Sequence, residues 1–185
     1  MTEEMFDFGG QDTSYLSHSL HPYPAKFPPQ LPRTILQQYS VKGETVLDPF
    51  CGTGGILIEA ELLGMYTVGS DFDPMMVHGC RQNITQPDLM LADATYLPFG
   101  NHTIDAVVTD FPYGQSVCIK KTDTMANLYA DALDEIHRVL KVGHRAVVVT
   151  HKDISDIVTS PLTILQRHEQ RVHKSLTRHI LVLIC

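Results

Sequence analysis

The sequence predicts a doubly wound α/β fold, which is an open, largely parallel sheet covered by helices. Residues 45–60 (TVLDPFCGTGGILIEA) read as a short apolar strand, a tight glycine turn and the apolar start of a helix. A second apolar run ends in Asp71, roughly twenty residues past these glycines, where such sheets place an acid that binds ribose hydroxyls. Further apolar runs alternate with amphipathic helical segments along the chain.

The glycine turn is typical of a cofactor-binding loop. Gly52, Gly54 and Gly55 let a ligand approach the backbone, and the following helix presents free N–H groups. The turn lacks the Lys-Ser/Thr pair of a phosphate-binding P-loop and the third glycine of a GxGxxG dinucleotide fingerprint. Asp48, just before the turn, would repel a pyrophosphate but suits a ligand that carries an ammonium group, such as S-adenosylmethionine.

A second candidate site is Asp110-Phe-Pro-Tyr-Gly114, which follows the apolar run 104–109. Ligands of open α/β sheets bind at the carboxyl ends of strands, so this loop should open beside the cofactor. The loop resembles motif IV of amino-methyltransferases, and the resemblance implies a physical requirement. A carboxylate and a backbone carbonyl accept the two N–H bonds of an exocyclic amine and favour its methylation, while an aromatic ring holds the base. Asp110, the carbonyl of Phe111 or Pro112, and Tyr113 fit these roles, and a plain β-turn is the alternative.

The composition predicts one globular domain. The 185 residues are 43% hydrophobic and 19% charged, and no apolar run approaches the roughly 20 residues that span a bilayer. The acidic N-terminus has no signal-peptide pattern, and the four dispersed cysteines predict reduced thiols and a cytoplasmic location. The histidines show no HxxxH or HExxH spacing, so we expect no metal. The net charge of −7 argues against a uniformly basic nucleic-acid surface.

Hydrophobic periodicity and the positions of proline and glycine predict the order of the helices and strands. Proline-rich residues 18–32 should be extended, and helices are expected at 31–39, from 56, at 75–83 and at 129–140. Strands are expected at 46–48, 66–71, 89–92, 104–109, 145–150, 162–170 and 175–184. Asp73 should cap the helix that Pro74 begins, and Gly143 should end the helix ahead of the fifth strand.

Several segments together resemble class I S-adenosylmethionine-dependent amino-methyltransferases. The segment DPFCGTGG from Asp48 resembles their motif I, and Asp110–Gly114 resembles their motif IV with Phe111 in place of its first proline. The segment HPYPAKFPP (21–29) resembles the one ahead of motif I in amino-methyltransferases of DNA and tRNA. The final segment HEQRVHKSLTRHILVL resembles archaeal tRNA guanine-N2 methyltransferases.

The resemblance implies a Rossmann-like fold, with a seven-stranded mixed sheet and a C-terminal antiparallel hairpin. It implies a single methyltransferase domain of residues 1–185, in which 1–44 form an N-terminal extension with the cofactor-covering proline-rich segment and 45–185 form the catalytic core. Guanine N2 in tRNA is the favoured target, because Asp beside Tyr-Gly in motif IV is typical of those enzymes. A DNA amino-methyltransferase acting on cytosine N4 or adenine N6 is the alternative. A non-catalytic cofactor-binding subunit of a larger assembly is the second alternative.

The resemblance also implies individual roles. In the family the proline-rich segment closes over the methionine end of the cofactor, where Lys26 could pair with its carboxylate. Phe72 would lie against the adenine, and Asp93 would bind the adenine amino group. The expected cofactor-binding residues are Pro24, Lys26, Phe27, Asp48, Pro49, Phe50, Cys51, Gly52, Gly54, Gly55, Asp71, Phe72, Asp93 and Ala94. The expected catalytic residues are Asp110, Pro112 and Tyr113.

Substrate recognition is expected to involve a partner. About forty residues precede motif I, where related tRNA enzymes carry a longer THUMP-type RNA-binding region. The resemblance therefore suggests an RNA-binding subunit or a small zinc-binding activator protein as a partner, with tRNA as the substrate and no membrane. The densest basic cluster could follow a phosphate backbone or consist of ordinary solvated hairpin charges; it contains Arg167, Arg171, Lys174 and Arg178, with His168 and His173.

Overall fold

The computed structural model describes residues 6, 8, 28–85, 87–114, 124–159, 161–173 and 175–185. The predictions for Pro24, Lys26 and Phe27 lie outside these residues. None of the described helices is long and apolar enough to cross a membrane.

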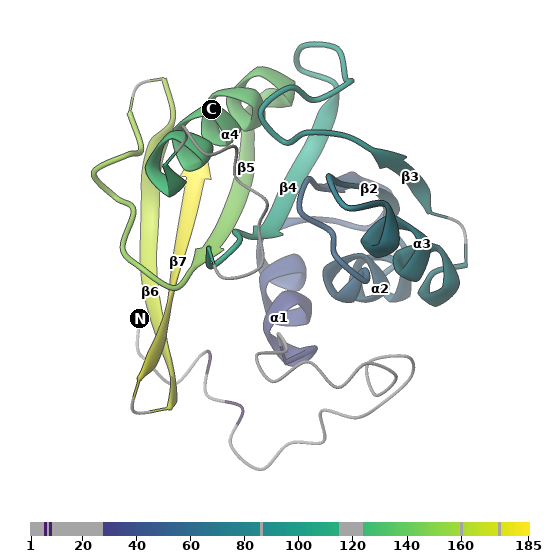
Figure 1. The fold of residues 1–185 in the computed structure, drawn as a ribbon, viewed down its shortest axis with the longest axis horizontal. Coiled ribbons are helices and arrows are strands. Elements are labelled where there is room, and N and C mark those ends of the chain that lie inside the picture. Colours follow the sequence, from purple (N-terminus) through teal and green to yellow (C-terminus); the bar gives the residue numbers. More distant parts are fainter. Residues whose placement is uncertain are drawn as a thin grey trace.

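The described strands form one seven-stranded sheet in the order β3-β2-β1-β4-β5-β7-β6 (Figure 1). The first five strands are parallel, and β7 lies antiparallel between β5 and β6. The strands are β1 (Thr45–Asp48), β2 (Tyr66–Asp71), β3 (Asp88–Leu91), β4 (Ile104–Asp110), β5 (Leu140–Thr150), β6 (Thr163–His173) and β7 (Leu176–Ile184). The predicted mixed sheet with a C-terminal antiparallel pair is confirmed.

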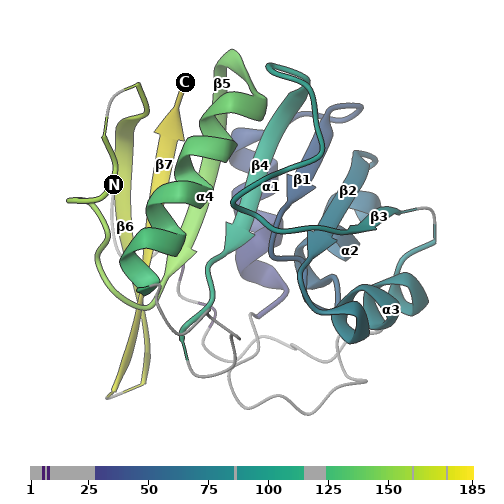
Figure 2. The same cartoon turned by 45° about the horizontal axis from the view of Figure 1, so that its top comes forward.

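Helices cover both faces of this sheet (Figure 2). They are α1 (Gln30–Tyr39), α2 (Gly55–Leu62), α3 (Pro74–Asn83) and α4 (Met125–Val139). On one face, α1 and α2 bury Leu36 and Ile56 in a cluster with Val46 and Val147 of the sheet. On the other face, α4 packs its apolar stripe against the sheet. The two faces therefore have separate cores, as expected of a doubly wound fold.

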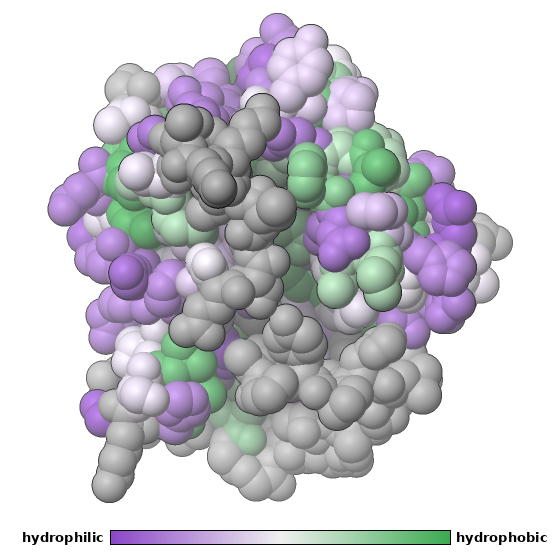
Figure 3. All heavy atoms as spheres, in the orientation of Figure 1, coloured by the Kyte–Doolittle hydropathy of each residue, from purple (hydrophilic) through white to green (hydrophobic). Residues whose placement is uncertain are grey.

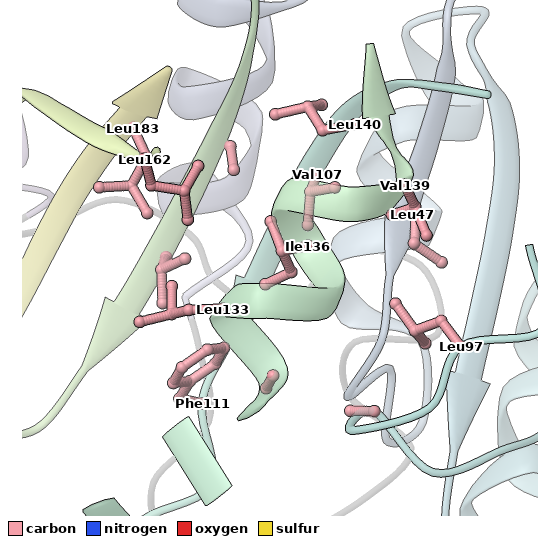
Figure 4. Close-up of a cluster of buried hydrophobic side chains, with 14 of the residues drawn as sticks. Leu47, Leu97, Val107, Phe111, Leu133, Ile136, Val139, Leu140, Leu162 and Leu183 are labelled. Carbon is pink, nitrogen blue, oxygen red and sulfur yellow. The ribbon is translucent and has the colours of Figure 1, made fainter. Parts of the chain in front are cut away.

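The core under α4 lies next to the predicted catalytic loop. Leu133 and Ile136 point from α4 toward the sheet residue Val107, and Phe111 extends the same cluster past the end of β4 (Figure 4). Leu133, Ile136 and Val107 are almost fully excluded from solvent. This packing anchors the segment that follows β4, because Phe111 is buried in the core and not exposed to solvent.

The connection into β5 differs from the prediction. Helix α4 begins at Met125, four residues ahead of the expected start, because Thr124 caps it by accepting a 3.2 Å hydrogen bond from the Asn127 N–H. Gly143 does not end the helix. The chain enters β5 directly at Leu140, and Gly143 lies within that strand with φ of +78°, near a register shift between β4 and β5. Gly143 does adopt a positive φ, but it does so at the register shift inside β5 and not at the end of a helix.

Arg138 at the end of α4 fixes the loop between β3 and β4. Its guanidinium donates hydrogen bonds of 2.8 and 2.7 Å to the carbonyls of Leu97 and Phe99 and pairs with Glu135 at 2.7 Å. Glu135 in turn accepts a 2.6 Å bond from the Leu97 N–H. The network therefore fixes the connection that leads from the carboxyl end of β3 to the start of β4.

Candidate active site

Three carboxylates end three neighbouring strands. Asp48, Asp71 and Asp110 are the last residues of β1, β2 and β4, and β1 lies between the other two strands. Burial raises the pKa of Asp48 and of Asp110 to about 7, and it also raises the pKa of Asp71. The negative charges of Asp71 and Asp110 raise the pKa of Asp48 further. The carboxyl ends of these strands therefore form a site that favours a cation.

Asp48 is held by the neighbouring strand β4 and by the turn that follows β1. Its Oδ1 accepts a 2.7 Å hydrogen bond from the Thr109 hydroxyl and a 3.1 Å bond from the Phe50 N–H. Both bonds lower the pKa of Asp48, but burial outweighs them. Thr109 was not predicted as a site residue, because in the sequence it is an ordinary residue of an apolar strand.

Asp71 connects the glycine turn to the second strand. One carboxylate oxygen accepts a 2.9 Å bond from the Gly52 N–H, and the other accepts a 2.9 Å bond from the Asp73 N–H. Asp73, and not Asp71, caps α3 by accepting from the Met75 N–H at 2.8 Å, with Pro74 at the helix start. The predicted cap is therefore confirmed, and the Asp71 carboxylate lies beside the turn.

Gly54 and Gly55 of the turn are surrounded differently, so glycine is needed at each for a different reason. Gly54 has φ of +91°, and a Cβ there would lie 2.7 Å from the Cys80 sulfur and 2.9 Å from the Ile84 side chain. Gly54 is therefore required by the protein's own packing. Gly55 has no positive φ, and a Cβ built on it meets nothing within 4 Å. The space beside Gly55, at the N-terminus of α2, is open to a ligand.

The remaining predicted cofactor residues surround this turn. Pro49 and Cys51 are buried beneath it, while Phe50 contacts the catalytic loop. Phe72 follows β2 with 65% of its surface exposed. Asp93 follows β3, and its Oδ1 accepts bonds from the Thr95 N–H and hydroxyl at 2.9 and 2.8 Å, next to buried Ala94. An exposed ring and an exposed carboxylate thus stand at the ends of β2 and β3, where an adenosine could lie.

These features fit S-adenosylmethionine. The open space at Gly55 admits a ligand close to the backbone, and the carboxylates favour its sulfonium and ammonium charges. When bound, the cofactor supplies an electrophilic methyl group. Among the described residues, no group of three His, Cys, Asp or Glu side chains is arranged to hold a metal ion.

The catalytic loop is fixed by aromatic packing around Phe111. Its ring, 1% exposed, lies 5.2 Å from Phe50 edge-on and 5.0 Å from Tyr129. Its N–H donates a 2.9 Å hydrogen bond to the Val149 carbonyl of β5. The Tyr129 hydroxyl donates a 2.5 Å bond to the Pro112 carbonyl, which retains a second lone pair. The residue that departs from motif IV is therefore a core residue that anchors the loop.

Asp110 and Tyr113 are in direct contact. The Tyr113 hydroxyl donates a 3.1 Å hydrogen bond to Oδ1 of Asp110. Its ring lies 4.8 Å from the imidazole of His151, tilted by 38°. Burial lowers the pKa of His151, so this ring is a neutral neighbour at pH 7. His151 follows β5 and was not predicted as a site residue, because a lone histidine after a strand has no motif around it.

The predicted basic cluster is divided. Arg167 and Arg171 are exposed on the edge strand β6, with Glu169 between them on the same side. Arg178 of β7 is 1% exposed and cannot contact a phosphate backbone at the surface. Lys174 has no described side chain. The prediction of one basic surface is therefore wrong for Arg178, because β7 is an interior strand whose side chains face the core.

The sheet order, the glycine turn after β1 and the acids at the strand ends define a class I methyltransferase domain with S-adenosylmethionine as its cofactor. Residues 20–180 match the family described as RMKL-like, methyltransferase domain. The chain belongs to this family.

Relatives of known name support the family. The chain is 38% identical over 169 residues to a tRNA (guanine(10)-N2)-dimethyltransferase of Methanothermobacter thermautotrophicus. The match covers 87% of this chain and 50% of the relative. It is 35% identical to the enzyme of the same name from Methanocaldococcus jannaschii, covering 85% and 46%. The chain thus spans about half the length of these relatives.

A solved structure shares the fold. The crystal structure of TrmN from Thermus thermophilus superposes with a TM-score of 0.75 at 22% identity, and the match covers 87% of this chain and 50% of the other. The seven-stranded architecture is therefore that of known methyltransferase structures.

Proposed function

We propose that this domain transfers a methyl group from S-adenosylmethionine to the exocyclic N2 amine of guanine in tRNA. The observation that carries the proposal is the Asp110 carboxylate, which ends β4 beside the cation-favouring carboxyl ends of β1 and β2. Relatives 35 to 38% identical are named for the same reaction. Alone, their names would leave the reacting groups of this chain unassigned.

The chemistry follows from the position of Asp110. An aromatic amine is a poor nucleophile because its lone pair is delocalised into the ring. The Asp110 carboxylate would accept one amine N–H, and the free lone pair of the Pro112 carbonyl would accept the other. With its pKa raised to about 7 by burial, Asp110 is also basic enough to take the proton that the methylated amine loses.

The cofactor roles of the strand ends belong to the same proposal. Asp71 would bind the ribose, Phe72 would pack on the adenine, and Asp93 would accept from the adenine amino group. The exposure of Phe72 and Asp93 supports these assignments, since a ligand could reach both. Residues 1–44 would form an extension whose proline-rich segment covers the cofactor, with Lys26 pairing with the methionine carboxylate.

A partner would complete substrate recognition. The chain matches only about half of its relatives' length. One structural neighbour, with a TM-score of 0.51, is a Haloferax volcanii methyltransferase in complex with the activator Trm112. Besides Phe72, exposed large side chains lie around the edge strand β3 and α3 in this chain (Figure 3), namely Met75, Leu91 and Tyr96. We propose that a small activator protein or an RNA-binding subunit covers part of this edge.

Transfer of radiolabelled methyl to bulk tRNA and to duplex DNA tests the function. The protein is assayed alone and with extract from its source, and the modified nucleoside is identified by mass spectrometry. We expect N2-methylguanosine in tRNA. Label that appears only with extract would assign substrate recognition to a partner.

Two controls make the assay decisive. Asp110→Asn should abolish transfer while cofactor affinity, measured by calorimetry, changes by less than about threefold. Methylated cytosine or adenine in DNA would replace the proposal with a DNA amino-methyltransferase. Tight cofactor binding with no label in either nucleic acid, with or without extract, would favour a non-catalytic subunit.

A further inference from the structure

Arg178 is a buried charge on β7, the strand beside the edge strand β6 of the sheet. It lies on β7 and is 1% exposed, which places it first among the largest fully buried side chains described. Burying a guanidinium is costly unless other groups compensate its charge and its donors. The next residues on the same face of β7, Ile180 and Val182, are apolar and belong to the core under α1 and α2. A charge at this position therefore requires a reason other than packing.

The sheet register brings Arg178 toward the catalytic loop. Asp110 pairs with Val149 of β5, and Val149 pairs with Ile180 of β7, so these residues form one row across the sheet. Arg178 is two residues from Ile180 and therefore on the same face. Asp110 shares a face with Val108, which packs in the same core as Ile180. Both charged side chains thus leave the same face of the sheet near the carboxyl end of β4.

Contacts link the two charges through Tyr113. The Tyr113 hydroxyl donates to Asp110 at 3.1 Å, and the guanidinium of Arg178 lies near enough to lower the pKa of Tyr113 by hydrogen bonding and by its charge. Since a guanidinium can only donate, Arg178 can bind the lone pairs of the tyrosine oxygen, while the tyrosine O–H points toward Asp110. Nη1 of Arg178 donates to Oε1 of Gln170 at 3.2 Å, and Nε2 of Gln170 donates to the Phe6 carbonyl at 2.8 Å.

We propose that Arg178 is a positioning residue of this active site, which holds the Asp110 carboxylate ionised and the Tyr113 hydroxyl aligned so that the amine of the base meets an anionic acceptor. The inference rests on the proposed function. Arg178 would not touch the reacting atoms itself. It would act through Asp110 and Tyr113.

The physical argument concerns the protonation of Asp110. Burial raises the pKa of this carboxyl to about 7, and the positive charge of Arg178 opposes that rise. The other described titratable groups that interact with it are the Asp48 carboxyl and the hydroxyls of Tyr113 and Tyr129, none of which supplies a positive charge. Without the guanidinium, the carboxyl would be largely protonated at neutral pH. A protonated carboxyl can donate to an amine but loses much of its capacity to accept from one. Arg178 would therefore set the lower pH limit at which the domain can methylate.

The test compares Arg178→Met, Arg178→Lys and, as an exposed control on β6, Arg171→Met. The Asp110 carboxyl is titrated by ¹³C NMR, with its signal assigned by its loss in Asp110→Asn. Single-turnover methyl transfer to tRNA is followed over the same pH range. In Arg178→Met we expect the Asp110 midpoint to rise by about one unit or more, and transfer to fall about fivefold or more at pH 7 but less at pH 9, in proportion to the ionised fraction of Asp110.

The other variants separate charge from structure. Arg178→Lys keeps the charge and should restore part of the midpoint and of the rate, whereas Arg171→Met should change neither. If Arg178→Met does not fold, Gln170→Leu removes one partner of the guanidinium and should still raise the Asp110 midpoint, by a smaller amount. An unchanged midpoint in the folded variants, or an equal loss of rate at every pH, would overturn the proposal.

The two readouts also distinguish this inference from the proposed function. A wild-type domain that methylates no tRNA would contradict the proposed function, while the NMR titration would still decide whether Arg178 controls Asp110. A midpoint that stays the same in an active enzyme would contradict only the role of Arg178.

Discussion

The hydroxyl of Tyr113 donates a hydrogen bond of 3.1 Å to the carboxylate of Asp110, three residues earlier in the same loop. The two residues predicted to act separately, one as an acceptor and one as a platform for the base, are therefore coupled. The hydrogen bond lowers the pKa of Asp110, although burial raises it more. The ring can still hold a base, since its hydroxyl and not its face makes this contact.

Replacing Tyr113 by Phe separates these two functions. The ring is retained, but Asp110 loses a bond that favours its ionised form. A hydrogen bond to a charged group is worth about 1.5 kcal/mol, which corresponds to about one pH unit. We expect the acid limb of the single-turnover rate to move up by about that amount, with rates near wild type at high pH. Tyr96→Phe, at an exposed position, is the control. A uniform fall in rate without a shift would show that the hydroxyl has another role.

Phe111→Pro, which restores the common form of motif IV, should destabilise the domain. Proline removes the N–H that donates to the Val149 carbonyl, and it leaves a cavity between Phe50 and Tyr129. Loss of a buried aromatic ring costs about 3–5 kcal/mol. Urea unfolding of the variant, with Phe111→Leu as the milder comparison, measures this cost. Equal stability of the proline variant and wild type would mean that the loop can repack.

Much of the fold follows from local sequence signals. The strand, glycine turn and helix at residues 45–60 and the Asp73-Pro74 cap are short-range features, and each is observed where it was expected. The error at Gly143 has a clear cause. A glycine near a helix end indicates a positive φ, but the pairing with β4 that places it inside β5 is a long-range property.

The site was harder to predict for a similar reason. Asp48, Asp71 and Asp110 end predictable strands, so topology alone brings them together. His151 and Arg178 carry no motif. They reach the site only because β5 pairs with β4 and β7 pairs with β5 in the sheet. Arg178 was assigned to a surface cluster because its sequence neighbours are basic and polar. Burial separates Arg178 from exposed Arg171, and sequence alone does not reveal that.

The two adjacent glycines of the turn should respond differently to alanine. Gly54→Ala forces a Cβ against Cys80 and Ile84 at a positive φ and should lower the free energy of unfolding by about 2 kcal/mol or more. Gly55→Ala has room in the protein and should leave stability unchanged or slightly higher, yet weaken S-adenosylmethionine binding at least tenfold. Thermal unfolding and calorimetry measure the two effects. Unchanged cofactor affinity in Gly55→Ala would remove this position from the binding site.

Asp48→Asn should weaken cofactor binding and raise the stability of the fold, and the size of both effects should depend on pH. Burial raises the pKa of Asp48 from 3.8 to about 7, so the folded state binds more protons than the unfolded state between these values. The stability contributed by Asp48 is therefore lost as pH rises from about 4 to about 7. Asparagine cannot ionise and keeps the oxygen that accepts from Thr109 and Phe50.

The Asn variant should thus melt at a higher temperature than wild type at about pH 8, with the difference vanishing near pH 4. A cation favours the ionised carboxylate, so the affinity of wild type for S-adenosylmethionine should rise with pH through about 7, and the variant should bind more weakly with a shallower pH dependence. Asp131→Asn, at an exposed position on α4, is the matched control. A variant that is less stable than wild type at pH 8 would mean that Asp48 is ionised in the fold without penalty, because its hydrogen bonds to Thr109 and Phe50 outweigh its burial.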